Sequence, residues 1–180
     1  EHKKIPFILH PCEYSNKMFW QAAYMFIGLN LKLCRKGFVT HDSHPWNVSF
    51  DGNKPIFFDF CSIIKNNNVN KSWLDGFFQG FIVPIWLSSF SKKTYNHSKE
   101  YRREHESGFG LNMFKSKIIK KIIFRQYNNL YKLNNNPEKL FNKILNWLDN
   151  NKPISAHPQK WSNYYKSTEI DYKTPTTIKQ

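Results

Sequence analysis

The stretch THDSHPWNVSFDGNKPIFFDFCSI, residues Thr40 to Ile63, decides how this 180-residue chain is interpreted. Aspartates, histidines and asparagines are packed here between short apolar runs. A run of this kind is either a polar loop between two strands or a functional site. The spacing of the polar residues within it distinguishes the two interpretations.

The second half of this stretch predicts a β-hairpin. The apolar runs Val48–Phe50 and Pro55–Phe58 are joined by Asp51-Gly52-Asn53-Lys54. An Asp-Gly pair between two apolar runs is a strong hairpin signal, and it makes Asp51 a turn residue. Because a hairpin reverses the chain, Asp59 is expected to return beside the loop that precedes Val48.

Three side chains in the stretch have the types and the order that phosphoryl transfer requires. That reaction needs a group that accepts or orients the proton of the attacking hydroxyl, and hard oxygen ligands for Mg²⁺. Asp42 and Asn47 are five residues apart (47 − 42 = 5), and Asp59-Phe60 follows the predicted hairpin. Protein kinases place an Asp and an Asn at this spacing in the catalytic loop, and a metal-binding Asp in an Asp-Phe-Gly turn.

The loop resembles that of the aminoglycoside and choline phosphotransferases. Asp42-Ser43-His44-Pro45-Trp46-Asn47 matches their Asp-x-His-Pro-x-Asn pattern. The resemblance implies that Asp42 is the catalytic base and that Asn47 and Asp59 are Mg²⁺ ligands that also bind the cofactor, ATP. It implies that His44 supports the loop. Trp46 is expected to pack on the loop, with stacking on a base or sugar as the alternative, and His41 either faces solvent or contacts a substrate.

The chain departs from the kinase pattern at several positions. Cys61 replaces the glycine of the Asp-Phe-Gly turn, and Thr40 stands where the catalytic loop has a histidine. Upstream there is neither a glycine-rich phosphate loop nor a strand lysine, so the N-terminal lobe of a kinase is missing from this sequence. The phosphates of a nucleotide would lack half of their usual cradle.

A second resemblance covers more of the chain. The residues that carry it are Glu13, Tyr14, Ser15, Met18, Ala22, Ala23, Asp42, Asn47, Phe50, Asp51, Gly52, Pro55, Phe57, Asp59, Ser62, Trp73, Pro84, Trp161 and Tyr164. Together they resemble a region of large bacterial class I SAM-dependent methyltransferase proteins that precedes the methyltransferase domain. No glycine-rich loop follows a predicted strand, so a SAM site within this chain is not expected.

Helices are predicted on both sides of the hairpin. Apolar residues at helical spacing follow Ser15, which is a good N-cap, and the helix is expected to end at Lys36 before Gly37. The other expected segments are an extended run at Ile5–Leu9, helices at Ser72–Leu87 (capped by Ser72), Lys115–Tyr127 and Asn136–Trp147, and a loop or lid over residues 91–110.

These elements predict an α+β fold that is mostly α-helical with one small β-hairpin. The resemblance implies the C-terminal lobe of a protein-kinase-like fold without the N-terminal lobe. We expect residues 1–150 to form this domain and residues 151–180 to form an extended tail or linker that docks on it through Trp161, Tyr164 and Tyr165. The apolar run Trp73–Phe90 is interrupted by polar residues and is expected to be a buried helix rather than a membrane span.

The composition favours anionic partners and a reducing compartment. The net charge of +14 is compatible with a nucleotide, another anionic small molecule or nucleic acid, although basic residues scattered for solubility, as along Lys115–Lys121, give the same number. The three cysteines have no metal-ligand spacing, and a cytoplasmic location is expected. The chain lacks an initiator Met, so it is interpreted as a fragment or processed product.

Three functions follow from these observations. The first is ATP- and Mg²⁺-dependent phosphotransfer to a small-molecule or glycan hydroxyl by an atypical, or degenerate, kinase-like domain. The second is a non-catalytic substrate-docking or scaffold domain of a SAM-dependent methyltransferase protein. The third is a basic nucleic-acid-binding protein, which rests on the net charge alone.

Overall fold

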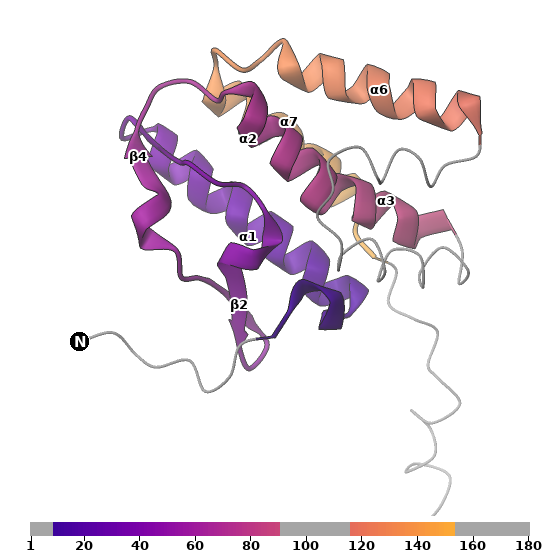
Figure 1. Ribbon diagram of the computed structural model, residues 1–180, viewed down its shortest axis with the longest axis horizontal. Coiled ribbons are helices and arrows are strands. Elements are labelled where there is room, and N and C mark those ends of the chain that lie inside the picture. Colours follow the sequence, from indigo (N-terminus) through magenta and orange to yellow (C-terminus); the bar gives the residue numbers. More distant parts are fainter. Residues whose placement is uncertain (1–8, 91–115, 154–180) are drawn as a thin grey trace, which may run out of the picture.

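The computed structural model describes residues 9–90 and 116–153 and is mostly helical (Figure 1). The lid at 91–110, the tail anchors Trp161, Tyr164 and Tyr165, and all of the predicted extended run Ile5–Leu9 except Leu9 lie outside the described residues. The elements are, in chain order, η1 (Pro11–Glu13), α1 (Asn16–Cys34), β1 (Phe38–Thr40), η2 (Pro45–Asn47), β2 (Val48–Asp51), β3 (Lys54–Phe57), η3 (Phe60–Ser62), β4 (Ile63–Lys65), α2 (Lys71–Phe77), the π-helical η4 (Phe78–Ile82), α3 (Val83–Phe90), α6 (Lys117–Tyr131) and α7 (Pro137–Asn150).

The first helix forms where its caps predict. The Oγ of Ser15 accepts a hydrogen bond from the backbone N–H of Met18 at 3.2 Å, and α1 ends at Cys34, slightly before the predicted end at Lys36. Gly37 then adopts a φ of 79°, a backbone conformation that residues other than glycine rarely adopt. The cap and the stop signal are both local, so the sequence is sufficient to place this helix.

Residues 9–90 and 116–153 contain two small sheets rather than the single hairpin that was predicted. Strands β2 and β3 form the expected hairpin, with Val48 opposite Phe57 and Gly52 in the turn at a φ of 61°. Strands β1 and β4 form a second antiparallel pair, with Thr40 opposite Ile63. Strands of three residues are too short to show the alternation that identifies a strand in a sequence.

The second long helical segment runs from Lys71 to Phe90 through α2, η4 and α3. Its cap is Asn70 rather than the predicted Ser72, because the Oδ1 of Asn70 accepts a hydrogen bond from the N–H of Trp73 at 2.7 Å. An asparagine at the N-cap position accepts a hydrogen bond from a backbone N–H of the first turn, which has no partner within the helix. The segment is buried along most of its length, as expected.

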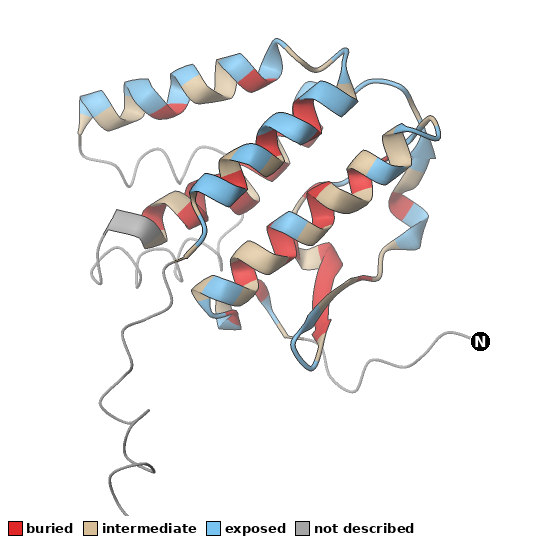
Figure 2. Cartoon of the chain, turned by 180° about the vertical axis from the view of Figure 1, so that it is seen from behind, coloured by how far each residue is buried: buried red, intermediate tan, exposed pale blue. Residues whose placement is uncertain are grey.

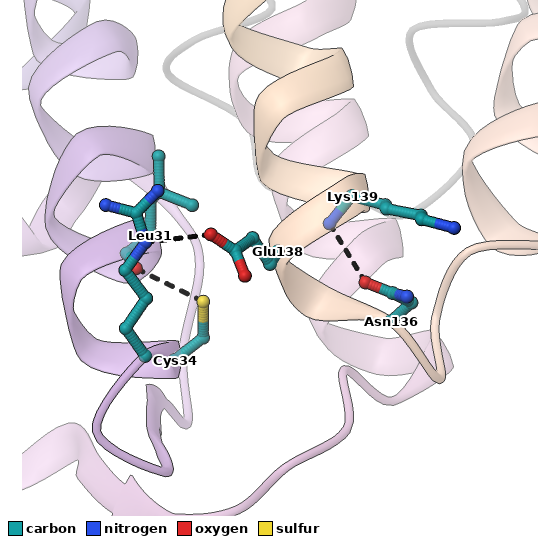
Figure 3. A network of polar contacts seen from close by, with 6 residues as sticks. Leu31, Cys34, Asn136, Glu138 and Lys139 are labelled. Atoms are coloured by element: carbon teal, nitrogen blue, oxygen red, sulfur yellow. Dashed lines mark hydrogen bonds and ion pairs between the residues drawn. The ribbon is translucent and has the colours of Figure 1, made fainter.

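Helices α6 and α7 begin close to their predicted starts. Ser116 caps α6, and Asn136 caps α7 by accepting from the N–H of Lys139 at 3.1 Å (Figure 3). The N-terminal end of α7 also faces the C-terminal end of α1, where Arg35 Nε pairs with Glu138 Oε1 at 2.8 Å. Both side chains of this pair are more than half exposed, so it adds little stability.

One hydrophobic core joins the helices to the hairpin. The ring of Phe26 in α1 stacks at about 6 Å on Trp73, Phe77 and Phe81 of the second segment. Helix α7 adds a fully buried face, whereas α6 buries few side chains and is largely exposed (Figure 2). The buried residues of α7 are Leu140, Phe141, Ile144 and Leu148.

No helix in residues 9–90 and 116–153 has both the length and the apolarity needed to cross a bilayer.

Candidate active site

Asp42, Asn47 and Asp59 lie on two loops that run between the two sheets. Residues 41–47 connect β1 to β2, and residues 58–62 connect β3 to β4. Because β1 pairs with β4 and β2 pairs with β3, both loops start and end at the same two ladders. We call residues 41–47 and 58–62 together the loop pair.

Hydrogen bonds close the loop pair at both ends. The N–H of His41 donates to the carbonyl of Ser62 at 2.5 Å, and the N–H of Phe58 donates to the carbonyl of Asn47 at 3.2 Å. Asp42 follows the first bond, Asn47 makes the second, and Asp59 follows Phe58. The two loops therefore run beside each other, with Asn47 and Asp59 at one closed end and Asp42 at the other, next to Ser62.

The carboxylates of Asp42 and Asp59 are not used by the described structure. Asp42 is exposed and Asp59 is half-buried, and neither carboxylate makes a hydrogen bond or ion pair to any described residue. Asp59 is the N-cap of η3, yet its side chain does not cap that turn; its carbonyl accepts from Ser62 instead. An aspartate at a cap position that leaves its carboxylate unused is available for another partner.

Asn47 differs from the two aspartates because it is buried. Only 8% of its surface is exposed, and its Nδ2 has no hydrogen-bond partner among the described residues. A buried amide nitrogen without a partner is costly, which is a common sign of a ligand site. A half-turn about χ2 exchanges the nitrogen and the oxygen, so the same side chain can present a carbonyl oxygen to a cation.

The loop of residues 41–47 packs against two glycines of the helical segment Lys71–Phe90. A Cβ on Gly76 would lie 2.7 Å from Ser43 Oγ, and a Cβ on Gly80 would lie 2.8 Å from Pro45 Cδ. Residues four apart share one face of a helix, so the loop sits against a stripe without side chains. The Oγ of Ser43 also donates to the carbonyl of Trp73 at 2.5 Å.

The segment under the loop is π-helical at Gly80. The N–H of Val83 donates to the carbonyl of Phe78, five residues earlier. Single turns of π-helix occur frequently at functional sites. Sequence reasoning missed this support, although two glycines four residues apart in a buried helix are a usable signal.

A buried polar network fixes the start of the loop. The Oδ1 of Asn30 accepts from both the N–H and the Oγ1 of Thr40, at 3.0 and 3.1 Å. The Oγ1 of Thr40 in turn accepts from Trp73 Nε1 at 3.0 Å. All three residues are buried, and their bonds tie α1, β1 and α2 together directly before His41. Thr40 thus holds the loop, and Asn30 is a positioning residue that sequence reasoning missed.

A buried tyrosine fixes the other end of the loop. The hydroxyl of Tyr14 donates to the carbonyl of Val48 at 2.6 Å, directly after Asn47. Burial, with a smaller contribution from Glu13, raises the pKa of Tyr14 well above its usual range. The hydroxyl therefore stays protonated and remains a donor at any physiological pH.

The remaining predicted residues occupy the loop or its edge. His41 is exposed, and His44 is half-buried at the N-cap of η2. Trp46 is half-buried and contacts the ring of His10 edge-on at 5.2 Å, so it packs against the protein. Asp51 lies in the hairpin opposite Lys54, outside the loop pair.

A comparison with known proteins gives one partial similarity. The nodulation protein NoeA of Rhizobium meliloti (strain 1021) is 32% identical over 98 residues, which are 53% of this chain. The chain covers only 20% of the length of that protein. No protein-family model matches the chain, and no solved structure matches it.

Proposed function

We propose that this chain is an atypical kinase-like domain that uses ATP and Mg²⁺ to phosphorylate a hydroxyl group of a small molecule or glycan. The observation that carries the proposal is the loop pair, in which two backbone hydrogen bonds join the loop of Asp42 and Asn47 to the loop of Asp59. In this proposal the helices and the hairpin are the counterpart of a kinase C-terminal lobe. The net charge of +14 also favours an anionic nucleotide.

The donor set fits the cofactor. The Asp59 carboxylate and the Asn47 amide oxygen are hard ligands of the kind that Mg²⁺ prefers. Asn47 and Asp59 would hold the cation, and the unused cap carboxylate of Asp59 is free to do so. Bound Mg²⁺ and ATP would supply the transferable phosphoryl group with its charge neutralised.

Asp42 has the surroundings that a base requires. Its side chain is exposed, so an acceptor hydroxyl can reach it. It makes no hydrogen bond or ion pair to the described residues. In this role it accepts or orients the proton of that hydroxyl as the oxygen attacks. The hydrogen bond from His41 N–H to Ser62 fixes the backbone next to it.

Nucleotide titration with and without Mg²⁺ tests the proposal. We expect the wild-type chain to bind ATP more tightly with Mg²⁺ than without it. Asp59→Asn should lose this Mg²⁺-dependent gain, while Asp42→Asn should keep the binding and lose the turnover of ATP to ADP. Asp51→Asn is the matched control, since Asp51 is the nearby aspartate outside the loop pair.

Two results would contradict phosphotransfer. One is wild-type binding of ATP that does not respond to Mg²⁺. The other is an equal effect of Asp51→Asn and Asp59→Asn, because it would show that the response is not specific to the loop pair.

The second candidate is a non-catalytic docking or scaffold module of a SAM-dependent methyltransferase protein. The observation that favours it is the match to a protein of which this chain covers only 20%, which is how a module of a longer protein would appear. It expects no nucleotide binding here. It also expects methyl transfer by the complete protein to fall when residues 1–180 are removed, and unchanged transfer would exclude this role.

A further inference from the structure

Helix α6 and its C-cap carry a row of basic side chains on their outer face (Figure 2). Lys117, Lys121, Arg125 and Lys132 are exposed, and their spacing of four, four and seven residues places them on one face of the helix. Neighbours four residues apart stand about 6 Å apart along the helix axis. Helix α6 contains no acidic residue, and none of the four side chains makes an ion pair to a described residue. We call these four residues the basic stripe.

A row of aromatic rings runs beside the basic stripe. The ring of Tyr127 lies between those of Phe124 and Tyr131, with centroids 6.4 and 6.3 Å away and planes within 25° and 9° of parallel. The hydroxyl of Tyr127 donates to the Oδ1 of Asp75 at 2.5 Å, which ties the middle ring to α2. The two outer rings, Phe124 and Tyr131, are exposed. The protein therefore presents two ring surfaces that are held in place before any partner arrives.

Basic and aromatic side chains meet in one open hollow of about 650 Å³. No acidic side chain is among the described residues of its lining. Cations and amide groups suit a chain of phosphates, and an aromatic ring beside them suits the flat face of an unpaired base. The described lining residues are Lys120, Lys121, Phe124, Arg125, Asn128, Asn129 and Lys132.

The order of side chains around α6 favours nucleic acid over a membrane. A helix that binds a bilayer surface turns one continuous apolar face outward. Here the basic stripe occupies the outermost positions and divides the exposed apolar side chains, with Phe124 and Tyr131 on one flank and Ile118 and Ile122 on the other. Inserting either flank into lipid would carry the basic stripe with it. A nucleic acid duplex is also disfavoured, because the faces of its bases are already stacked on one another.

We propose that this face of α6 binds single-stranded nucleic acid, with phosphates on the basic stripe and unpaired bases stacked on Phe124 and Tyr131. Stacking and phosphate contacts tolerate any base, so the binding has little sequence preference. Helix α6 lies across the α2–α3 segment from the β2–β3 hairpin (Figure 1). The proposal therefore does not depend on phosphotransfer at the loop pair.

Fluorescence anisotropy of the wild-type chain with labelled oligo(dT) of about 20 nucleotides tests the proposal. We expect a Kd of about 1–100 µM near physiological salt, and binding roughly fivefold or more tighter than to a duplex of the same length. Four phosphate contacts, at about 0.7 each, predict a slope of about −3 for the logarithm of affinity against that of salt concentration. No binding at about 50 mM salt, or equal affinity for the duplex, would overturn the proposal.

An aromatic variant and its control test the stacking. Phe124→Ala should weaken oligo(dT) binding by about tenfold, because one stacked base is lost, and should change the salt slope little. Ile122→Ala removes an exposed apolar side chain on the other flank and should stay within about twofold of wild type. An equal effect of the two variants would overturn the stacking. So would binding to phosphatidylserine vesicles that displaces oligo(dT) and that Ile122→Ala abolishes, since the face would then dock on a membrane.

A charge variant and its control locate the phosphates. Lys121→Gln combined with Arg125→Gln should make the salt slope shallower by about 1.4, which is two contacts at about 0.7 each. Lys32→Gln combined with Lys36→Gln makes the same charge change at the end of α1, where the exposed side chains do not line the hollow. This control should keep the wild-type slope. If both pairs flatten the slope equally, the binding follows net charge alone and the basic stripe is not the site.

All of the substituted side chains are exposed, so each variant should keep the circular dichroism spectrum of the wild type. The preference of the wild-type chain for the single strand over the duplex needs no variant and decides the proposal by itself if one of them fails to fold.

Discussion

The buried polar network of the core and the three candidate side chains of the loop pair, Asp42, Asn47 and Asp59, are used in opposite ways. In the core, Asn30, Thr40 and Trp73 are buried and satisfy one another through bonds of 3.0–3.1 Å. In the loop pair, Asp42 and Asp59 bond to no described residue through their carboxylates, and the Nδ2 of buried Asn47 has no partner there. The polar groups of the core network are therefore occupied by bonds within the fold, whereas the carboxylates of Asp42 and Asp59 and the Nδ2 of Asn47 are not.

This difference separates the residues that stabilise the fold from those available for binding or catalysis. Buried polar groups that are fully bonded fix one arrangement of the chain, and leaving one unbonded is destabilising. Polar side chains that a rigid scaffold holds without using them are the usual arrangement at functional sites. Substitutions in the core should therefore change stability, and substitutions of the loop carboxylates should not.

The largest effect is expected for Phe26→Ala. The ring of Phe26 is fully buried and stacks on three aromatic rings, so its loss should lower the free energy of unfolding by about 3–5 kcal/mol in denaturant titration. Tyr24→Ala on the exposed side of α1 is the control and should cost about 1 kcal/mol or less. Equal losses for the two variants would contradict the placement of the core.

A smaller loss is expected for Thr40→Val, which keeps the shape and removes the hydroxyl. Trp73 Nε1 would lose its acceptor, and Asn30 Oδ1 would lose one of its two donors. We expect a loss of about 2 kcal/mol in the free energy of unfolding. Thr40→Ser keeps the hydroxyl and should lose clearly less; if the two variants are equally unstable, the network does not hold the loop.

Gly80→Ala should cost about 1 kcal/mol. Alanine gains about 1 kcal/mol of helix propensity, but its Cβ would lie 2.8 Å from Pro45 Cδ, and such overpacking costs about 1–3 kcal/mol. Gly28→Ala is a matched control, because a Cβ on Gly28 meets nothing within 4 Å and should be stabilising. The same sign of change in both variants would show that the loop does not rest on Gly80.

The smallest effect on stability is expected for Asp42→Asn and Asp59→Asn. Neither carboxylate bonds to a described residue, so each variant should stay within about 0.5 kcal/mol of wild type in thermal or denaturant unfolding. A loss above about 1 kcal/mol would mean that the carboxylate supports the fold. The comparison between the core and the loop pair would then fail.

Local signals in the sequence predicted a large part of the fold and named the candidate residues. Ser15, Gly37 and the Asp51-Gly52 turn act within a few residues of themselves, so α1 and the hairpin could be placed without tertiary information. The cap at Asn70 was assigned to Ser72 because two residues with good capping side chains stand only two positions apart. Strand β4 was missed because its three residues acquire strand geometry only from β1.

The sequence by itself determined which residues are candidates, since Asp42, Asn47 and Asp59 are recognised by their types and spacing. The predicted hairpin already returns Asp59 beside the loop of Asn47. Only the tertiary structure decided that the other end of the two loops is closed, because β1 pairs with β4 and His41 bonds to Ser62 across a long stretch of sequence. It also decided the roles of Asn30, Gly76 and Gly80. Each acts through a partner at least ten residues away, and a linear pattern does not contain contacts of that range.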